Sequence, residues 1–512
     1  MNNMKSLLMG GLILSTQLIG AQEHPNIIIF LVDDMGVMDT SLPFLTDNNG
    51  NPVRYPLNDW YRTPNMERLA QRGIRFSTFY AQSVSSPSRA SIMTGQNATR
   101  HHTTNWIKAE SNNRDQYGPY NWNWEGLKTN NLTLPRLLQK QGYRTIHVGK
   151  AHFGCKGSEG EIPQNLGFDV AIAGSSIGSP GSYYGESGYG YIKGNKLRAV
   201  PDLEKYHGTD TFLTEALTIE ANAQIDQAVA EKEPFFLYMS HYAVHGPFEI
   251  DSRFSAHYES SDKPADTKCF ATLIEGMDKS LGDMMDHLDS LGVAENTLIF
   301  FLGDNGSDAP LGPSREYSSS APLRGKKGAE FEGGMRVPCI VAWVKPDKSN
   351  KWQKQYPLAE GAVQTQMGTV MDVLPTLATF AGAEIPDSYP VDGQDLRTLL
   401  TGKADRTRED CFLMHFPHNH RGSYFTVYRE GEWKLVYYYN PEHPERPDCL
   451  LYNLVEDPGE QKEISALNPE KTLDMLRRMI IRLENEGALY PVDFDGREVR
   501  PDIAFFETKF AE

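Results

Sequence analysis

A serine and an arginine lie four positions apart in the run Ser-Ser-Pro-Ser-Arg that begins at Ser85 and ends at Arg89. A serine hydroxyl is a weak nucleophile at its usual pKa and needs a base or a chemical change to act. The guanidinium of Arg89 is always charged, and its planar donors suit an oxyanion such as sulfate or phosphate. The pair predicts chemistry on a tetrahedral anion. The alternative is a common Ser/Pro turn before a helix, with Ser88 as its N-cap and Arg89 on the surface.

Polar side chains follow two apolar runs, 26–32 (NIIIFLV) and 297–302 (TLIFFL), which have the composition of buried strands. The side chains are Asp33 and Asp34 after the first run, and Asp304 and Asn305 after the second. Because ligands of open α/β sheets bind outside the carboxyl ends of the strands, we expect these oxygens to meet at one divalent-cation site. Oxygen donors without histidine or cysteine favour Ca²⁺ or Mg²⁺ over zinc. The alternative for each doublet alone is ordinary turn chemistry.

Between these runs the chain alternates between the patterns of helices and strands. Thr133 opens a helix that Gly142 can close, and 143–148 follows as a strand. A longer helical pattern at 274–291 precedes the second apolar run. The alternation predicts an α/β fold, with a large mixed, mainly parallel sheet between layers of helices.

Several separated motifs occur in order along the chain. They are Asp33-Asp34, the run from Ser85 to Gly95, the segment from Gly142 to His152, Asp304-Asn305-Gly306, and Gly325-Lys326-Lys327-Gly328 before Glu332-Gly333-Gly334. Together they resemble the ordered signature of the type I, formylglycine-dependent sulfatases of the alkaline phosphatase superfamily. The resemblance spans most of the chain, and agreement of all the motifs in the family's order is not expected by chance.

The resemblance implies that a maturase converts Ser85 into Cα-formylglycine after synthesis. Serine at this position implies a bacterial maturase, typically an anaerobic one. The hydrated aldehyde carries a pair of hydroxyl groups on one carbon, so that one can attack sulfur in line and the other can later expel sulfate. A sulfated serine would instead be a stable dead end. Arg89 is implied to hold the oxygens of the hydrate.

The resemblance also implies one Ca²⁺ ion per chain, which would orient the nucleophile and spread negative charge. Its implied protein ligands are Asp33, Asp34, Asp304 and Asn305. Sulfate and hydrate oxygens would complete the coordination shell.

Lysines and histidines complete the implied site. Lys150 and Lys327 would hold the remaining sulfate oxygens. Lys326 lies beside Lys327, and counting back from the Glu-Gly-Gly that follows favours Lys327. His245, in a His-x-Pro setting, would protonate the leaving alcohol, and His152 would deprotonate the remaining hydroxyl of the hydrate.

The sequence pattern changes after 392–402, which look like the end of the large domain. Downstream, 424–439 is typical of a hairpin and 472–486 of a terminal helix. We therefore predict a catalytic domain at 22–405 and a smaller C-terminal domain at 406–512, with a short antiparallel sheet and one helix.

The N-terminus has the features of a signal peptide. Lys5 precedes an apolar stretch at 7–19, and the pattern predicts cleavage after Ala21. The stretch is too short to span a bilayer, and the alternative is a short buried helix. No cysteine follows it, so a lipoprotein anchor is not indicated. We expect residues 1–21 to direct export to a periplasm, or secretion beyond it, with no membrane span.

Length and charge set further bounds. A chain of 512 residues suits one large domain and a smaller one. The formal net charge of -17 argues against a nucleic-acid partner, so local cations and the metal must attract an anionic substrate. The 5 cysteines are scattered and odd in number, which excludes a full disulfide framework and gives no zinc spacing.

A pair of segments outside the motifs are candidates for contacts with a sulfated glycan. Trp122 and Trp124 lie in a polar loop and suit stacking on a sugar ring, although they equally suit pinning the loop to the core. A polar cluster in the smaller domain either reaches the cleft or belongs to the surface. Its members are His415, His418, His420 and Arg421. We predict removal of sulfate from a carbohydrate, at an accessible end of the chain.

Three other functions fit parts of the pattern. A phosphomonoesterase or phosphodiesterase of the same superfamily shares the sheet and the metal location. Such enzymes usually bind a pair of metals through added histidines, and Asn305 stands where they tend to have one. A non-catalytic glycan-binding protein would leave Ser85 unconverted. A lipid-envelope transferase is disfavoured because the sequence has no membrane span. The complete set of partners favours a sulfuric ester hydrolase.

Overall fold

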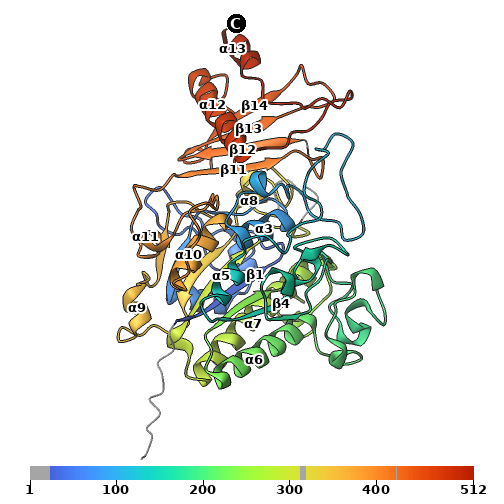
Figure 1. Cartoon of the computed structure of the whole chain (residues 1–512), viewed down its shortest axis with the longest axis vertical. Helices are drawn as coiled ribbons and strands as arrows, with labels where there is room; N and C mark the ends of the chain where they lie inside the picture. The colour runs from blue at the N-terminus through green and yellow to red at the C-terminus, as the bar shows by residue number, and fades with distance from the viewer. Residues whose placement is uncertain (1–23, 312–318, 423, 512) are drawn as a thin grey trace, which may run out of the picture.

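The computed structural model describes residues 24–311, 319–422 and 424–511 (Figure 1). The predicted signal peptide at 1–21 lies outside these ranges and stays a prediction. Within them the chain forms a large α/β body and a smaller, C-terminal sheet with its own helices (Figure 1).

An 8-stranded sheet forms the centre of the large body, in the order β5-β4-β6-β1-β7-β8-β2-β9. The strands are β1 Asn26–Val32, β2 Gly73–Phe76, β4 Arg144–Gly149, β5 Val170–Ile172, β6 Phe235–Ser240, β7 Thr297–Gly303, β8 Cys339–Trp343 and β9 Ala362–Gln364. Strand β8 runs antiparallel to both of its neighbours, whereas the other pairs in this sheet are parallel. The predicted mixed, mainly parallel sheet is confirmed.

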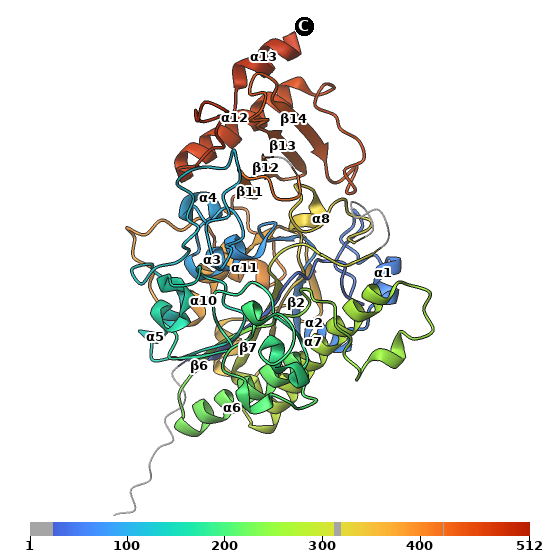
Figure 2. The ribbon, with the colours of Figure 1, turned by 90° about the vertical axis from the view of Figure 1, so that its right-hand side faces the viewer.

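The side chains of β1 alternate between the faces of the sheet, and both faces are covered. Ile27, Ile29 and Leu31 belong to one apolar core, and Ile28, Phe30 and Val32 belong to the other. The first core includes helices α3 Ser85–Thr94, α5 Leu134–Gln139 and α10 Val373–Phe380. The second includes α2 Pro64–Gln71, α6 Leu213–Glu231 and α7 Ala265–Ser290, and Figure 2 labels all of these helices. Burial on both faces explains why β1 is a continuous apolar run. Among the described residues, no helix combines the length and the apolarity that crossing a bilayer requires.

The C-terminal sheet has the antiparallel order β11-β12-β13-β14 and sits at one end of the molecule (Figure 2). Its strands are β11 Cys411–Phe416, β12 Phe425–Glu430, β13 Trp433–Tyr438 and β14 Asp448–Asn453. One face packs on α12 Pro469–Glu486 and α13 Ile503–Ala511, and the other joins the core of the large body. The predicted hairpin and terminal helix correspond to β12–β13 and α12, and α13 is an element that we did not predict.

Shorter elements complete the fold. They are α1 Pro56–Trp60, α4 Ala98–His101, α8 Glu332–Met335, α9 Lys351–Gln355 and α11 Arg397–Leu400, with β3 Phe79–Tyr80 paired to β10 Gly368–Thr369. All 5 cysteines lie in the described ranges as free thiols.

A buried ionic cluster joins the small sheet to the large body. Lys434 of β13 places its Nζ atom 2.6 Å from Oε1 of Glu460 and 3.2 Å from Oε1 of Glu332. Burial raises the pKa of Glu460 to about 7, against the influence of Lys434. The pKa of Glu332 is lowered to about 2, because Lys434 and neighbouring arginines outweigh the effect of burial. One ammonium group therefore serves a pair of carboxylates at this interface.

Candidate active site

Neighbouring central strands end at the same edge of the sheet. Strands β4, β6, β1 and β7 are consecutive, and Val32 pairs with Gly303 in the register of β1 and β7. The residues that follow, Asp33 and Asp304, are therefore adjacent although they lie far apart in the sequence. The parallel register thus brings the predicted ligands together at the expected edge.

The acidic cluster at this edge is fully buried. One carboxylate oxygen from each of Asp33, Asp34 and Asp304 lies within 4.8 Å of the others. Asn305 joins them, because its Nδ2 donates to Asp34 Oδ1 at 2.9 Å. Burial, and then the charge of Asp33, raise the pKa of Asp304 to about 6. Crowding of buried carboxylates at one point is unfavourable unless positive charge lies close to them.

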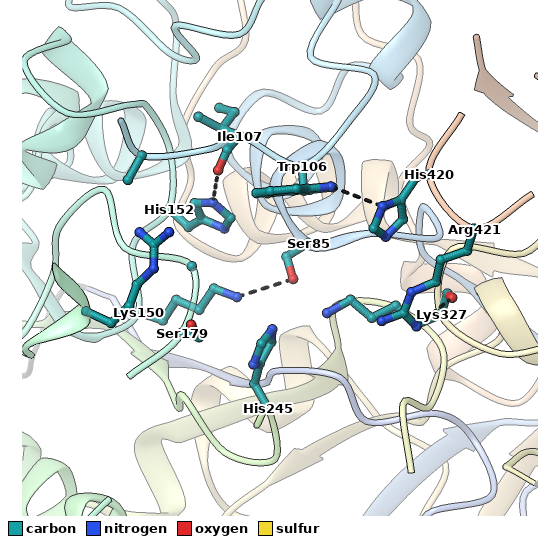
Figure 3. A pocket seen from close by; sticks show the side chains of 13 residues that line it. Ser85, Trp106, Ile107, Lys150, His152, Ser179, His245, Lys327, His420 and Arg421 are labelled. Carbon is teal, nitrogen blue, oxygen red and sulfur yellow. Dashed lines mark hydrogen bonds between the residues drawn. The ribbon is translucent and has the colours of Figure 1, made fainter. Parts of the chain in front are cut away.

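Ser85 lies directly on this cluster. Its Oγ is 3.0 Å from Asp33 Oδ1 and 3.1 Å from Asn305 Oδ1, and Lys150 Nζ donates to it at 3.3 Å (Figure 3). Ser85 is also the first residue of α3, whose N-terminus presents free N–H groups and the positive end of the helix dipole. The Ser85 hydroxyl thus contacts the side-chain oxygens of Asp33 and Asn305, while Lys150 and the N-terminus of α3 can stabilise negative charge on it.

Arg89, one turn further along α3, has no exposed surface. Its Nε donates to Asp304 Oδ2 at 2.9 Å, and its Nη2 lies 2.8 Å from the same oxygen. Its Nη1 donates to the Lys150 carbonyl at 3.0 Å and to Ser240 Oγ at 2.6 Å. The guanidinium does not line the pocket; it binds Asp304 from the protein interior and so fixes the position of this carboxylate.

A pair of lysines face the cluster from opposite sides of Ser85 (Figure 3). Lys150 Nζ is 2.7 Å from Asp33 Oδ2, and Lys327 Nζ is 2.6 Å from Asp34 Oδ1. Burial lowers the pKa of Lys150, although Asp33 opposes this effect. The pKa of Lys327 is raised, because Asp34 and further carboxylates outweigh burial. Both ammonium groups line the pocket over Ser85.

The histidine rings near Ser85 differ in their bonding. His245 Nδ1 is 2.8 Å from the Gly246 carbonyl, which can only accept, so Nδ1 carries a proton and Nε2 faces Asp34 Oδ2 at 3.6 Å. His152 Nε2 donates to the Ile107 carbonyl at 2.6 Å, which leaves Nδ1 as an acceptor (Figure 3). Burial lowers the pKa of His245 to about 4, and burial together with Lys150 holds the pKa of His152 well below its usual range.

The backbone is strained at Asp34 and His152. Their φ angles are 61° and 53°, in the left-handed region that L-residues seldom adopt. Asp34 is held there by hydrogen bonds of its neighbour Asp33, which donates to the Ala243 carbonyl at 2.9 Å and accepts from Val244 N at 2.7 Å. Strain of this kind persists where surrounding structure fixes it, and functional sites are the usual place.

A cavity of about 240 Å³ opens onto Ser85. Its lining residues are Ser85, Trp106, Ile107, Ala109, Lys150, His152, Gly178, Ser179, Arg198, His245, Lys327, His420 and Arg421 (Figure 3). Among the predicted substrate residues, His420 and Arg421 lie here. His420 Nδ1 accepts from Trp106 Nε1 at 3.2 Å, and Arg421 pairs with Asp308 through both terminal nitrogens, at 2.7 and 2.8 Å. A small, cationic pocket with one aromatic wall suits an anionic polar ligand.

The other predicted substrate residues do not line this pocket. Trp122 is buried and donates to Asn112 Oδ1 at 3.1 Å, and its ring packs edge-on against His418. His418 and His415 are also buried, with Thr104 Oγ1 and Thr426 Oγ1 as partners. Trp124 borders a separate surface hollow. The expectation that these four side chains contact substrate is not supported, because three have internal partners and the fourth faces elsewhere.

Sequence reasoning also missed lining residues, above all Trp106 and Arg198. Trp106 precedes Ile107, whose carbonyl holds His152, so its position is tied to the site. Arg198 follows a glycine-rich stretch at 174–194, and its sequence neighbours give no chemical signal. Neither residue belongs to a motif, and only the folded arrangement identifies them.

The chain belongs to the sulfatase family. The family model described as Sulfatase matches residues 25–383, and a second, described as N-sulphoglucosamine sulphohydrolase, C-terminal, matches 327–486. Members of this family are sulfuric ester hydrolases, and the chain is an enzyme of this class.

Relatives match the chain over nearly its whole length. N-acetylgalactosamine-6-sulfatase of Mus musculus is 29% identical over 520 residues, covering 92% of this chain and 88% of that protein. A sulfatase of Formosa agariphila is 27% identical over 550 residues, covering 94% and 92%. The crystal structure of Ps i-CgsB superposes with a TM-score of 0.69 at 25% identity, covering 91% and 94%. BT4656, solved with its substrate D-glucosamine-2-N,6-O-disulfate, shares the fold at a TM-score of 0.63 and 18% identity, covering 91% and 98%.

Proposed function

We propose that this enzyme removes O-sulfate groups from a carbohydrate and that its nucleophile derives from Ser85. The observation that best supports this proposal is the position of Ser85 Oγ, which lies 3.0 Å from Asp33 Oδ1 and 3.3 Å from Lys150 Nζ. Ser85 also borders the cationic pocket. A sulfate ester placed over Ser85 would meet ammonium groups on either side. The sulfur atom would then lie next to the nucleophile, and the sulfate oxygens would lie next to the positive charges.

The donor set fits one Ca²⁺ ion. Asp33, Asp34 and Asp304 form a buried cluster of carboxylates, and oxygen is the donor that Ca²⁺ prefers. Asn305 is buried beside them and offers its Oδ1. The three carboxylates face the three cations Arg89, Lys150 and Lys327, so their charges balance. A divalent ion would add positive charge that suits a sulfate ester, and when bound it would act as a Lewis acid on ester oxygens.

We further propose that a maturase converts Ser85 to Cα-formylglycine. When present, this group supplies a hydrated aldehyde as nucleophile and a route for releasing sulfate. The position of Ser85 at the start of α3 suits an oxygen nucleophile, because helix N–H groups and Lys150 stabilise developing negative charge there. We also propose that residues 1–21 direct export to the periplasm or beyond.

Lysine and histidine side chains of the pocket would bind the sulfate group and transfer protons. Lys150 and Lys327 would bind sulfate oxygens as fixed charges. His245 already carries a proton on Nδ1, so protonating Nε2 makes it an imidazolium that can give this proton to the leaving alcohol. A bound sulfate ester beside it would raise its pKa from the low resting value. His152 would accept a proton at Nδ1, because Nε2 already donates to Ile107.

A sugar alcohol is the proposed leaving group. The N-acetylgalactosamine-6-sulfatase relatives act on a sulfated sugar by name, and the pocket offers matching features. Trp106 provides an aromatic wall for a ring, and His420 and Arg421 provide polar contacts beside it. The size of the cavity favours a terminal sugar, in keeping with exo action.

The test is sulfate release by the full chain, made with and without an anaerobic maturase, from a panel of sulfated monosaccharides and oligosaccharides. Matched phosphate esters serve as the control. We expect sulfate release only after maturation. Efficient cleavage of the phosphate esters with none of the sulfate esters would refute the proposal.

A further inference from the structure

Arg198 lines the pocket, and so do Gly178 and Ser179. The backbone of Arg198 is bonded to the segment that follows Gly178 and Ser179, because Gly181 N donates to the Arg198 carbonyl at 2.6 Å. The contact is close: a Cβ on Gly181 would lie 2.4 Å from the Asn195 carbonyl oxygen. The segment before Arg198 thus packs on Gly181 through a close backbone contact that only glycine allows at this position.

The guanidinium of Arg198 is oriented by an acid outside the pocket. Its Nη1 lies 2.8 Å from Glu110 Oε1, and its Nη2 donates to Glu110 Oε2 at 3.3 Å. Glu110 directly follows the lining residue Ala109 but does not itself line the cavity. A guanidinium has five N–H donors in a fixed plane, and the bidentate pair uses only part of them. Glu110 therefore fixes the plane of Arg198 and leaves donors free for another anion.

The charge around the cavity favours such an anion. Among the described residues that line it, four carry positive charge and none is acidic, although the whole chain has a net charge of -17. Contacts with Asp33 and Asp34 hold Lys150 and Lys327 beside Ser85, where the sulfate that is removed would bind. Arg421 belongs to the same side, since it donates to the Lys327 carbonyl at 3.2 Å. Arg198 has no such link to the acidic cluster.

The segment that leads to Arg198 carries further positive charge. Lys193 and Lys196 are exposed on the segment that leads to Arg198. Tyr191 is 64% exposed and stacks on His207 with ring centroids 5.6 Å apart, which fixes an aromatic face at the surface. Cations next to a fixed aromatic face suit the neighbouring residues of an anionic glycan.

Resting on the proposed function, we propose that Arg198 binds a second anionic group of the glycan, besides the sulfate that is removed. This group is a carboxylate or a further sulfate, both of which match the planar donors of arginine. It lies on the same sugar or on the adjacent one. The substrates preferred by this enzyme are therefore glycans with more than one negative charge near the cleaved ester.

The experiment compares the matured full chain with the matured Arg198→Gln variant on three substrates with the same cleavable sulfate. One has no other charge, one carries a second sulfate, and one is joined to a uronate. We expect Arg198→Gln to lower kcat/KM on at least one of the doubly charged substrates by roughly tenfold more than on the singly charged one. The substrate that shows the larger loss identifies the second anion as sulfate or carboxylate.

Arg144→Gln is the matched control. Arg144 also pairs with a glutamate, Glu231, at 2.8 Å and is similarly buried, but it lies at the start of β4, away from the pocket. Thermal unfolding confirms that each variant folds. Arg198→Lys, which keeps the charge and loses the planar fork, should give an intermediate loss.

Equal losses on all three substrates, or the same pattern for Arg144→Gln, would overturn the assignment of Arg198 while leaving the sulfatase activity intact. Failure of the matured wild-type enzyme to release sulfate from any of them would instead overturn the proposed function.

Discussion

Lys327 Nζ lies 2.6 Å from Asp34 Oδ1, whereas Nζ of the adjacent Lys326 lies 2.7 Å from Asp308 Oδ1. Consecutive lysines therefore point to different acids, and only Lys327 reaches the cluster below Ser85. Asp34 has a pKa held well below its usual range, since Lys327 and other cations outweigh burial. The pair stays charged across the neutral range and keeps one ammonium group fixed at the pocket.

The adjacent lysines provide a matched test of sulfate binding. We expect Lys327→Ala to lower kcat/KM on a sulfated sugar by roughly 10²–10³, the usual loss when a fixed donor to transition-state charge is removed. Lys326→Ala removes the same charge one residue away and should cost much less. Steady-state kinetics of both matured variants decide the matter. Equal losses of kcat/KM in the two variants would show that the general positive charge near the pocket matters, and would contradict a direct contact between Lys327 and sulfate.

Calcium should stabilise the fold. Protein stripped with a chelator should melt at a lower Tm, and adding Ca²⁺ should restore it, because an ion that binds only the folded state adds free energy of unfolding. At a hundredfold excess over the Kd the gain is about 3 kcal/mol. Differential scanning calorimetry with Ca²⁺, Mg²⁺ and Zn²⁺ measures this.

Asp34→Asn should weaken the Ca²⁺ response in the same experiment. Asp278→Asn changes another buried carboxylate, which accepts from Asn65 N and Met66 N, and should leave the response unchanged. A stoichiometry of more than one bound ion, or a response to Zn²⁺ alone, would speak against the single calcium site.

His245 should matter in proportion to how poor the leaving group is. We expect His245→Asn to lower the rate by about 10²–10⁴ on a sugar sulfate, whose alkoxide needs a proton as it departs. On an aryl sulfate with an acidic phenol the loss should be far smaller, because that leaving group departs without one. Rates on both substrate types measure the difference. A similar loss on each would assign His245 to binding and not to proton donation.

The buried cluster of Lys434, Glu332 and Glu460 predicts that the free energy of unfolding depends on pH. The pKa of Glu460 is raised in the folded state to about 7, so the folded form binds its proton more tightly than the unfolded form. This stabilisation is complete below the unfolded pKa of about 4.5 and is lost as pH rises through about 7. The shift corresponds to roughly 3 kcal/mol. Glu332, with its pKa lowered to about 2, acts in the opposite sense and loses its contribution only as pH falls from about 4.5 towards 2.

Glu460→Gln should therefore change Tm in a pH-dependent way. At pH 5 the wild-type side chain is already neutral, so the two proteins should melt alike. At pH 8 the variant should melt at a higher temperature, since no buried carboxylate has to ionise. Melting curves across this range give the result, and a Tm difference that does not change with pH would contradict the raised pKa.

The sequence was most informative where local pattern determines structure. The apolar runs before Asp33 and Asp304 predicted buried strands, and parallel pairing brings their ends together without further information. The position of Ser85 followed from its motif. Arg89 was assigned by the same motif, but the structure shows its guanidinium bonded to Asp304, to the Lys150 carbonyl and to Ser240 Oγ, outside the lining of the pocket.

Substrate contacts could not be predicted in the same way, because they depend on how loops pack. His415 and His420 both belong to one polar cluster in the sequence, yet β11 directs His415 to Thr426 and the Leu489 carbonyl, and only the turn after the strand brings His420 to Trp106. Arg198 had no local signal, since its position depends on the contact between Gly181 and the Arg198 carbonyl. Tertiary packing, not residue type, decides which polar side chains reach the pocket.

The central claim, that converted Ser85 is the nucleophile, is tested most directly by joining peptide mass to activity. In preparations with graded amounts of maturase, mass spectrometry gives the fraction of the Ser85 peptide that has lost the mass of two hydrogen atoms. We expect the rate of sulfate release to rise in proportion to this fraction and to be absent in folded Ser85→Ala. Full activity in protein whose Ser85 is wholly unconverted would contradict the account.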